Sequence, residues 1–293
     1  MESVEQFSHE TSVAAVRGYF DGLGDGEWHR LTADLPAMVS FEVHRRFLRR
    51  FVKPGMRVLE IGAGPGRFTI ALAELGARVV VTDISQVQLE LNALHVGEAG
   101  HEAAVESRSL LDICDTGRFD DAEFDAVLAY GGPLSYAFDN ADRAFAGLLR
   151  LTAAGGPVVA SVMSTLGAYR HFLPSVLQIA QTHGEEANDL ILRTGDLRPT
   201  QPPGSGQHTC RMFRFSDLRD LVALAGGRIL DASASNWASL GDQEALRSFA
   251  EDPDRWQRFL DQEVAMCAEP GALDGGTHLL FAAATSHSGQ NSH

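Results

Sequence analysis

The segment VLEIGAGPGRF, residues 58–68, places three glycines within five positions directly after an apolar run. An apolar run, a glycine-rich turn and a following helical segment together predict a buried strand, a tight turn and a helix that begins at the turn. Such a turn leaves backbone N–H groups exposed at the positive end of the helix dipole, where a ligand can contact bare main chain. The segment therefore predicts an α/β fold with a ligand site at this turn.

The same alternation of strand and helix continues along the chain. Strands are predicted over 56–63, 77–83, 104–110, 124–130, 157–163 and 277–285. Helices are predicted over 36–51, 67–75, 140–151 and 253–267 and from 85 onward, with a helix and a strand within 216–233. Strands that alternate with helices of about ten residues are typical of βαβ units, so we expect a mostly parallel sheet.

Two segments do not follow this alternation. Residues 1–35 include GYFDGLGDGEWHRL, whose four glycines favour a loop or a broken helix. Residues 164–207 combine one predicted helix near 171–182 with a stretch rich in Pro and Gly, which is typical of a lid, a substrate-contacting insertion or a surface loop. The predicted units are an N-terminal cap segment, a core in two parts, a lid-like insertion and a flexible tail: 1–35, 36–163 with 208–285, 164–207 and 286–293.

The glycine spacing narrows the class of ligand. Gly62, Gly64 and Gly66 form G-x-G-x-G, followed by Arg67 and Phe68. A dinucleotide site needs G-x-G-x-x-G, whose third glycine lets the helix and strand pack closely around a pyrophosphate. Because that spacing is not met, a nicotinamide-dependent oxidoreductase is the less favoured interpretation.

In these residues the chain resembles the class I S-adenosylmethionine-dependent methyltransferases, whose first motif is a strand that ends in a carboxylate followed by G-x-G-x-G. Asp83 ends the second predicted strand, 17 residues after Gly66, where the family has its ribose-binding acid. LLDICD (110–115) has the place of the family's adenine-contacting segment, and FDAVLAYGG (124–132) resembles its fourth strand. The likeness covers roughly 36–163 and 208–285.

The resemblance implies a Rossmann-like sheet of seven strands, mostly parallel with the last antiparallel, with helices on both faces. It implies S-adenosylmethionine as the cofactor, lying across the carboxyl ends of the first strands. The residues that it places at the amino-acid end are Glu60, Gly62, Ala63, Gly64 and Gly66. Those that it places elsewhere are Asp83 and Ile84 at the ribose, Asp112 and Ile113 at the adenine, and Tyr130 and Gly131 at the sulfonium.

The chemistry that the resemblance implies is in-line displacement at a sulfonium methyl group. Since that methyl is already electrophilic, the protein must mainly position the acceptor, exclude water and remove a proton where the acceptor carries one. The candidates for that proton transfer, to none of which we assign the role, are His208, His171, His29 and Tyr136. The residues expected in the substrate pocket are Tyr19, Trp28, Tyr136 and Tyr169.

Charge and motif content favour a small organic acceptor, of which a specialised metabolite is one example. The chain has 24 Lys and Arg against 39 Asp and Glu, and its formal net charge of −15 disfavours nucleic acid and anionic membranes as partners. The family's DNA amino-methylating members have D/N-P-P-Y/F/W after the fourth strand, where this chain has YGGPLSY. Methylation of protein or RNA, and a non-catalytic protein that binds S-adenosylmethionine, remain alternatives.

The remaining composition indicates an intracellular protein. Cys114, Cys210 and Cys267 are far apart and form neither a disulfide framework nor a zinc pattern, so we expect no metal site. The N-terminus has no basic segment followed by an apolar one, and no apolar stretch approaches the roughly 18 residues of a membrane span. We therefore expect a cytoplasmic protein, for which a homodimer is one compatible assembly.

Overall fold

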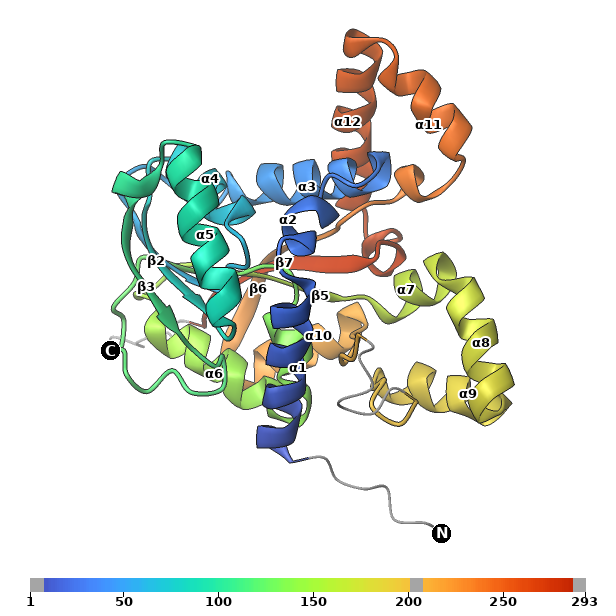
Figure 1. The fold of residues 1–293 in the computed structure, drawn as a ribbon, viewed down its shortest axis with the longest axis horizontal. Helices are drawn as coiled ribbons and strands as arrows, with labels where there is room; N and C mark the ends of the chain where they lie inside the picture. The colour runs from blue at the N-terminus through green and yellow to red at the C-terminus, as the bar shows by residue number, and fades with distance from the viewer. Residues whose placement is uncertain (1–7, 201–207, 287–293) are drawn as a thin grey trace, which may run out of the picture.

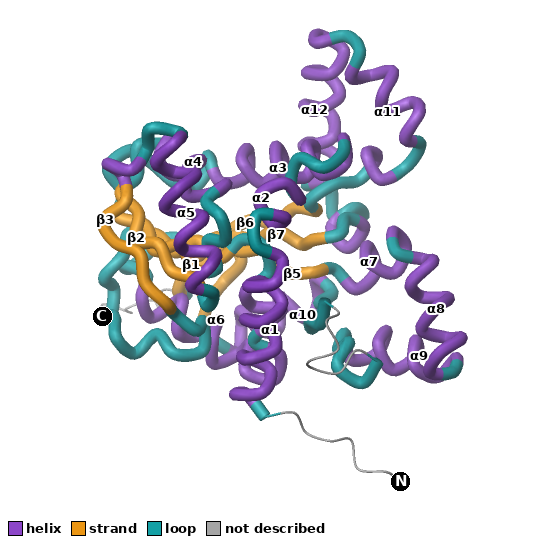
Figure 2. Tube along the Cα trace, in the orientation of Figure 1, coloured by secondary structure: helices purple, strands orange, loops and turns teal. Residues whose placement is uncertain are grey.

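A seven-stranded sheet forms the centre of the computed structural model, which describes residues 8–200 and 208–286 (Figures 1 and 2). The strand order is β3-β2-β1-β4-β5-β7-β6, in which β7 is antiparallel to both of its neighbours and the other pairs are parallel. This topology confirms the predicted Rossmann-like fold. The strands are β1 (Arg57–Ile61), β2 (Arg78–Asp83), β3 (Val105–Leu110), β4 (Ala126–Ala129), β5 (Val158–Met163), β6 (Gly227–Ala234) and β7 (His278–Thr285).

The parallel register brings the carboxyl ends of the central strands to one edge of the sheet. Ile61 of β1 pairs with Thr82 of β2, and Glu60 pairs with Leu128 of β4. These strands are almost completely buried, as expected for continuous apolar runs in a parallel sheet. The glycine turn after β1, the acid that ends β2 and the segment after β4 therefore lie together, at the edge where α/β proteins bind their ligands.

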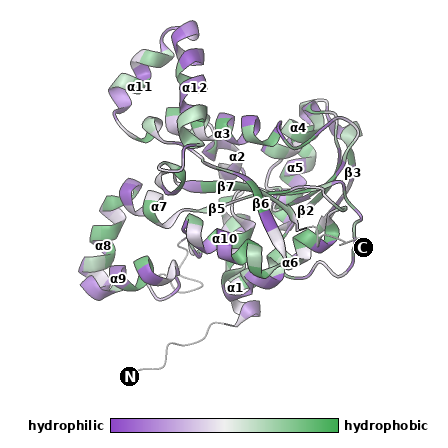
Figure 3. Cartoon of the chain, turned by 180° about the vertical axis from the view of Figure 1, so that it is seen from behind, coloured by the Kyte–Doolittle hydropathy of each residue, from purple (hydrophilic) through white to green (hydrophobic). Residues whose placement is uncertain are grey.

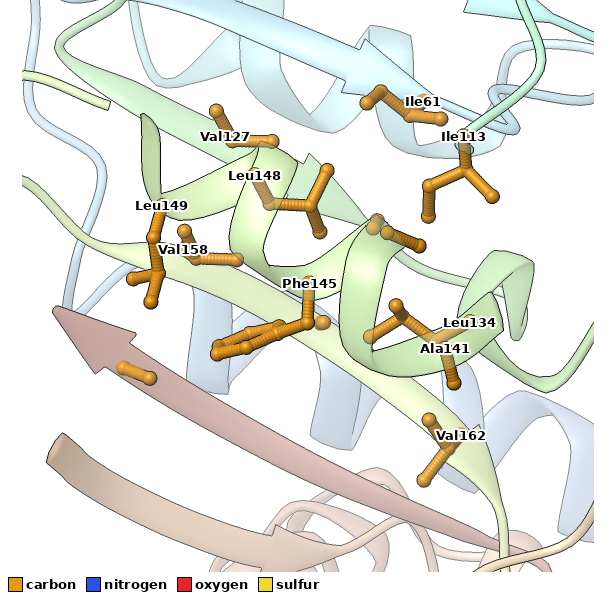
Figure 4. Close-up of a cluster of buried hydrophobic side chains, with 14 of the residues drawn as sticks. Ile61, Ile113, Val127, Leu134, Ala141, Phe145, Leu148, Leu149, Val158 and Val162 are labelled. Atoms are coloured by element: carbon orange, nitrogen blue, oxygen red, sulfur yellow. The ribbon is translucent and has the colours of Figure 1, made fainter. Parts of the chain in front are cut away.

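Helices cover both faces of the sheet. On one face, Phe145 and Leu148 of α6 (Ala141–Leu151) pack against Val127 and Val158 of the strands, as Figure 4 shows, and α10 (Phe215–Leu224) lies beside α6. The other face is covered by α3 (Leu35–Leu48), α4 (Arg67–Glu74), α5 (Gln86–Glu98) and α12 (Pro253–Cys267). The helices carry both hydrophobic and hydrophilic residues (Figure 3), as expected of elements with one buried side.

The segment 8–35, a predicted loop or broken helix, is a broken helix in the structure. Its two parts are α1 (His9–Leu23) and α2 (Gly26–Arg30). They are separated at Gly24, whose φ of 51° is in the left-handed region that favours glycine. In Figure 1, α1 runs across the front of the molecule at the edge of the sheet.

The insertion contains more helix than the single segment predicted near 171–182. It forms α7 (Thr165–His171), α8 (Leu173–His183) and α9 (Glu185–Thr194). Breaks at Phe172 and at Gly184, which has a φ of 87°, interrupt the apolar periodicity that a longer helix would show. The sequence prediction also missed α11 (Gln243–Ala250), whose one buried side chain is Leu246. Residues 201–207 and 287–293, parts of the predicted insertion and tail, lie outside the described residues.

Helices α11 and α12 project from the rest of the molecule (Figure 1). A buried carboxylate on α12 is bonded to the loop that precedes α11. Glu263 of α12 accepts backbone N–H bonds from Trp237 at 2.7 Å, Ala238 at 3.0 Å and Ser239 at 3.1 Å. The Ser239 hydroxyl also donates to it, at 2.7 Å. One side chain thus satisfies three backbone N–H groups, of which that of Ser239 would otherwise be buried without a partner.

We expect Glu263→Ala to lower the free energy of unfolding by about 3 kcal/mol, since it removes these hydrogen bonds and leaves the buried Ser239 N–H unpaired. Urea denaturation followed by circular dichroism measures this change. Glu251→Ala, at an exposed position at the end of α11, should change stability by less than about 0.5 kcal/mol. Equal stabilities of the two variants would contradict the role given to Glu263.

Candidate active site

The glycine turn adopts a backbone that requires glycine. Gly62, Gly64 and Gly66 have φ values of 68°, 54° and 104°, which side chains of L-residues rarely tolerate. A Cβ atom on Gly62 would also lie 2.5 Å from Cγ of Pro133, and one on Gly66 would lie 3.0 Å from Val96. The turn therefore presents bare main chain at the sheet edge.

Glu60, predicted at the amino-acid end of the cofactor, has its carboxylate behind the turn. It is buried, and it accepts a 2.6 Å hydrogen bond from the Thr69 hydroxyl of α4. Burial raises the pKa of Glu60 to about 8, so the carboxyl group is largely protonated at neutral pH. Ala63 is held by its N–H to the Thr82 carbonyl, at 3.1 Å. Both residues thus support the turn from behind.

Asp83 fastens the turn to the end of β2. Its two carboxylate oxygens accept the N–H groups of Gly64 and Ser85, each at 2.8 Å. Burial raises its pKa to about 6. Ser85 in turn caps α5 by accepting the N–H of Gln88, whereas the Gln88 side chain donates to the carbonyls of Phe20 and Gly24. The loop after β2 is thereby tied to the N-terminal segment.

A narrow cavity of about 80 Å³ lies over this edge of the sheet. Of the residues predicted to bind the cofactor, those that line it are Gly62, Gly64, Asp83, Ile84, Asp112, Ile113 and Gly131. Val13, Val16 and Phe20 of α1 form its opposite wall. The Asp112 carboxylate accepts the Cys114 N–H at 2.9 Å and contacts Nε2 of His9 at 2.8 Å, so α1 is held over this cavity.

A larger cavity of about 480 Å³ adjoins the first. Phe20, Glu27, Gly131 and Tyr136 line both cavities, so they mark the junction. Further from the junction the lining is mostly apolar or aromatic, with residues contributed by distant parts of the chain. Among these residues are Phe68, Met163, Ala168, Phe172, Leu197 and Met212.

Tyr136 and His208, two of the residues considered for proton transfer, are in direct contact. The Tyr136 hydroxyl lies 2.7 Å from Nε2 of His208, and the ring of Tyr19 is 5.3 Å from that imidazole. Burial, followed by the charge of Arg30, lowers the pKa of His208 to about 4. Burial also raises the pKa of Tyr136 well above its ordinary value. At neutral pH the pair is therefore an uncharged phenol beside an uncharged imidazole, which can accept a proton.

Of the other residues predicted for proton transfer or for the substrate pocket, some line the larger cavity and the rest line neither cavity. His171 lines the larger cavity together with Tyr19. His29 is exposed, beside Asp25, and Tyr169 is half-buried on α7 outside the described cavity linings. The ring of Trp28 stacks on that of His95, with 3.9 Å between the ring centroids, and the Arg67 guanidinium lies over the same indole. Trp28 therefore fastens α2 to α4 and α5.

Tyr130 lines neither cavity, and it packs behind two residues that line the larger one. Successive residues of a strand point to opposite faces of the sheet, and Tyr130 shares the face of Leu128. Its ring packs on Phe68 and His44, and its hydroxyl lies 3.4 Å from the His44 carbonyl. The next residue, Gly131, is the one that reaches the junction.

The sequence prediction missed several polar residues of the larger cavity, among them the charged or titratable Glu27, Arg30, His44 and His278. His44 lies one helical turn after Ser40, whose carbonyl is 2.7 Å from its Nδ1, and burial lowers its pKa to about 4. A histidine on the apolar face of α3 was the available signal. Glu27 and Arg30 have i, i+3 spacing inside the glycine-rich segment.

The sequence comparisons agree with this geometry. A family model described as "Methyltransferase domain" matches residues 58–156. The ribosomal RNA large subunit methyltransferase E of Thermoplasma acidophilum is 30% identical over 173 residues, which are 55% of this chain and 75% of that protein. The chain belongs to the class I S-adenosylmethionine-dependent methyltransferases.

Other members of this family are similar over different lengths. The ubiquinone biosynthesis O-methyltransferase of Mesorhizobium japonicum is 31% identical over 111 residues, or 36% of this chain and 43% of that protein. The structure of magnesium protoporphyrin IX methyltransferase from Synechocystis, with S-adenosylhomocysteine bound, superposes with a TM-score of 0.58. The superposition includes 93% of this chain and 99% of the magnesium protoporphyrin IX methyltransferase chain, at 16% sequence identity, and so shows that the two share a fold.

As a methyltransferase of this family, the protein uses S-adenosylmethionine as its methyl donor. The residues present fit that molecule. The turn has no Cβ atoms at Gly62 and Gly64, Asp83 offers carboxylate oxygens to a ribose, and Ile84 and Ile113 are apolar neighbours for an adenine. In the part of the chain that the structure describes, no helix is long and apolar enough to cross a bilayer.

The pKa of Asp83 predicts how binding of S-adenosylhomocysteine depends on pH. The ionised carboxylate offers both oxygens to ribose hydroxyls, so affinity should be full above about pH 7 and fall as the pH drops through 6. We expect a loss of about tenfold between pH 7 and pH 5, measured by titration calorimetry. Calorimetry at pH 6 in buffers of different ionisation enthalpy should show release of a proton on binding.

Two variants identify the group that titrates. Asp83→Asn should weaken binding and abolish the proton release at pH 6. Glu60→Gln, which keeps a hydrogen-bonding partner for Thr69, should retain that release. Affinity that stays constant from pH 5 to pH 8 in the wild-type protein would contradict the role given to Asp83.

Proposed function

We propose that the protein transfers the methyl group of S-adenosylmethionine to a small, largely apolar organic acceptor held in the larger cavity. The observation that carries this proposal is that the two cavities meet at Phe20, Glu27, Gly131 and Tyr136. A cavity of about 480 Å³ with a mostly apolar lining is of the size that small ligands occupy. The likeness to the ubiquinone biosynthesis O-methyltransferase and the magnesium protoporphyrin IX methyltransferase supports an acceptor of this class.

The residues of the cavity would act mainly by positioning. S-adenosylmethionine, when bound, supplies an electrophilic methyl group on a sulfonium. Phe68, Met163 and Met212 enclose the acceptor and exclude water. We propose His208 as the general base for an acceptor that carries a proton, either directly or through the Tyr136 hydroxyl, because it lines the larger cavity and its Nε2 lies 2.7 Å from that hydroxyl at the junction.

Helices α7 to α9 would then act as a cover over the acceptor. Ala168, His171 and Phe172 line the cavity from α7 and its end. The side chains of Leu173 and Leu177 on α8 are 57% and 59% exposed, so this segment contributes few buried contacts of its own. Elements of that kind open at low free-energy cost.

RNA methylation is a second candidate, favoured by the 30% identity to a ribosomal RNA methyltransferase. Two observations disfavour RNA as the acceptor: the net charge of −15, and a lining in which Arg30 is the one Lys or Arg among the described residues of both cavities.

An assay that measures release of S-adenosylhomocysteine separates a small-molecule acceptor from RNA. It is run with quinols, phenols, heteroaromatic amines and aromatic carboxylates, and in parallel with ribosomal RNA transcripts. Turnover on RNA alone would overturn the small-molecule proposal.

If the release assay finds an acceptor that loses a proton from an O–H or N–H group on methylation, we expect His208→Asn to lower kcat for that acceptor about 10²-fold or more. Tyr136→Phe should lower kcat less, because it leaves the imidazole in place. Affinity for S-adenosylhomocysteine, measured by calorimetry, should change by less than about threefold in both, because His208 lines only the acceptor side and Tyr136 loses one hydroxyl. His183→Gln, exposed at the end of α8, is the matched control, and an unchanged kcat in His208→Asn would exclude that residue as the base.

A further inference from the structure

A charged pair of α2 borders the junction of the two cavities: Glu27 lines both of them, and Arg30 lines the larger one. Glu27 and Arg30 of α2 form a two-point ion pair, with Nη2 to Oε1 at 2.5 Å and Nε to Oε2 at 2.8 Å. The Glu27 side chain is 11% exposed and that of Arg30 is 44% exposed. A shielded carboxylate contributes little net stability even when paired, so its presence here calls for a reason beyond folding.

The position of this pair relates it to the glycine turn. Glu27 lines both cavities, and its Cγ lies 3.8 Å from where a Cβ of Gly64 would be. The carboxylate side chain therefore stands directly across from bare main chain. Arg30 lines the larger cavity beside Glu27, one turn further along α2.

The other acids that line these cavities already have defined places. Asp83 is bonded to the turn and to Ser85, Asp112 to Cys114, and Asp34 accepts the N–H that begins α3. Among the described residues that line either cavity, Arg30 is the one that carries a guanidinium or ammonium group. Glu27 and Arg30 thus place a negative and a positive group side by side near the glycine turn. A ligand that carries both an ammonium and a carboxylate group would match this pair.

We propose that Glu27 and Arg30 bind the amino-acid end of S-adenosylmethionine, Glu27 taking the ammonium group and Arg30 the carboxylate. The inference rests on the proposed site of methyl transfer. In the free protein each charge satisfies the other, and a bound zwitterion supplies one partner of opposite sign to each, so no unpaired charge is buried in either state. The N-terminal segment would thus recognise the part of the donor that the glycine turn contacts only through main chain.

The test uses thioethers that differ only in the amino-acid end. They are S-adenosylhomocysteine, its decarboxylated aminopropyl analogue, and 5′-methylthioadenosine, which lacks both charged groups. Affinities for Glu27→Gln and Arg30→Gln are measured by titration calorimetry, with folding checked by circular dichroism. The matched controls are Glu42→Gln and Arg45→Gln, an i, i+3 pair on α3 that lines neither cavity.

Both variants should bind S-adenosylhomocysteine about tenfold more weakly or worse, and 5′-methylthioadenosine within about threefold of the wild-type protein. Arg30→Gln should also leave the aminopropyl analogue within about threefold, because that ligand has no carboxylate. The Glu42 and Arg45 variants should match the wild-type protein with all three ligands. If one α2 variant fails to fold, the other decides the outcome.

Equal losses for S-adenosylhomocysteine and 5′-methylthioadenosine would overturn the proposal, since they would indicate a general disturbance of the cavity. Unchanged affinities would overturn it as well and would assign the pair to the acceptor side. A wild-type protein that binds none of the three ligands would instead be a failure of the proposed function.

Discussion

The hydrogen bond from the Gly64 N–H to the Asp83 carboxylate, which closes the glycine turn onto the end of β2, is the interaction on which the site depends. Three left-handed residues reverse the chain within one turn after β1, and the Asp83 carboxylate holds that turn by the Gly64 N–H. The same carboxylate begins the loop into α5 through the Ser85 N–H. The Ala63 N–H and the Thr82 hydroxyl join the ends of β1 and β2 as well, at 3.1 Å and 2.8 Å, but the Asp83 carboxylate is the group that reaches the middle glycine of the turn, on the floor of the narrow cavity.

Two buried carboxyl groups, those of Glu60 and Asp83, lie at the glycine turn, and they differ in their protonation near pH 7. The pKa of Glu60 is about 8 and that of Asp83 about 6, both raised by burial. For each group the folded chain holds its proton at a pH where the unfolded chain has lost it, so its contribution to stability falls as pH rises from about 4 to the folded pKa. Glu60 completes a hydrogen bond as a neutral acid near pH 7, whereas Asp83 is then mostly ionised and can accept ribose hydroxyls.

The donor side of the site could be predicted from sequence because its residues follow a short local pattern. The turn, the acid that ends β2 and the segment LLDICD each follow a strand, and parallel pairing brings them together. Strand alternation also separates Tyr130 from Gly131, since neighbouring residues face opposite sides of the sheet and Gly131 is the one that lines the two cavities. Local periodicity did not indicate α9 or α11, which bury few side chains.

The larger cavity could not be predicted in the same way, because its walls combine α2 and α3 with segments far from them in the sequence. Arg30, His44, Tyr136, His208 and His278 come from helices, loops and a strand that meet only in the folded chain. The lowered pKa values of His44, His208 and His278 arise from the burial that this assembly produces, so the linear sequence does not indicate them. The short helix α2 borders both cavities, because Glu27 lines each of them and Arg30 lines the larger one. With the roles proposed for Glu27 and Arg30, a change in α2 would weaken donor binding, and it would also reshape a wall of the cavity proposed for the acceptor.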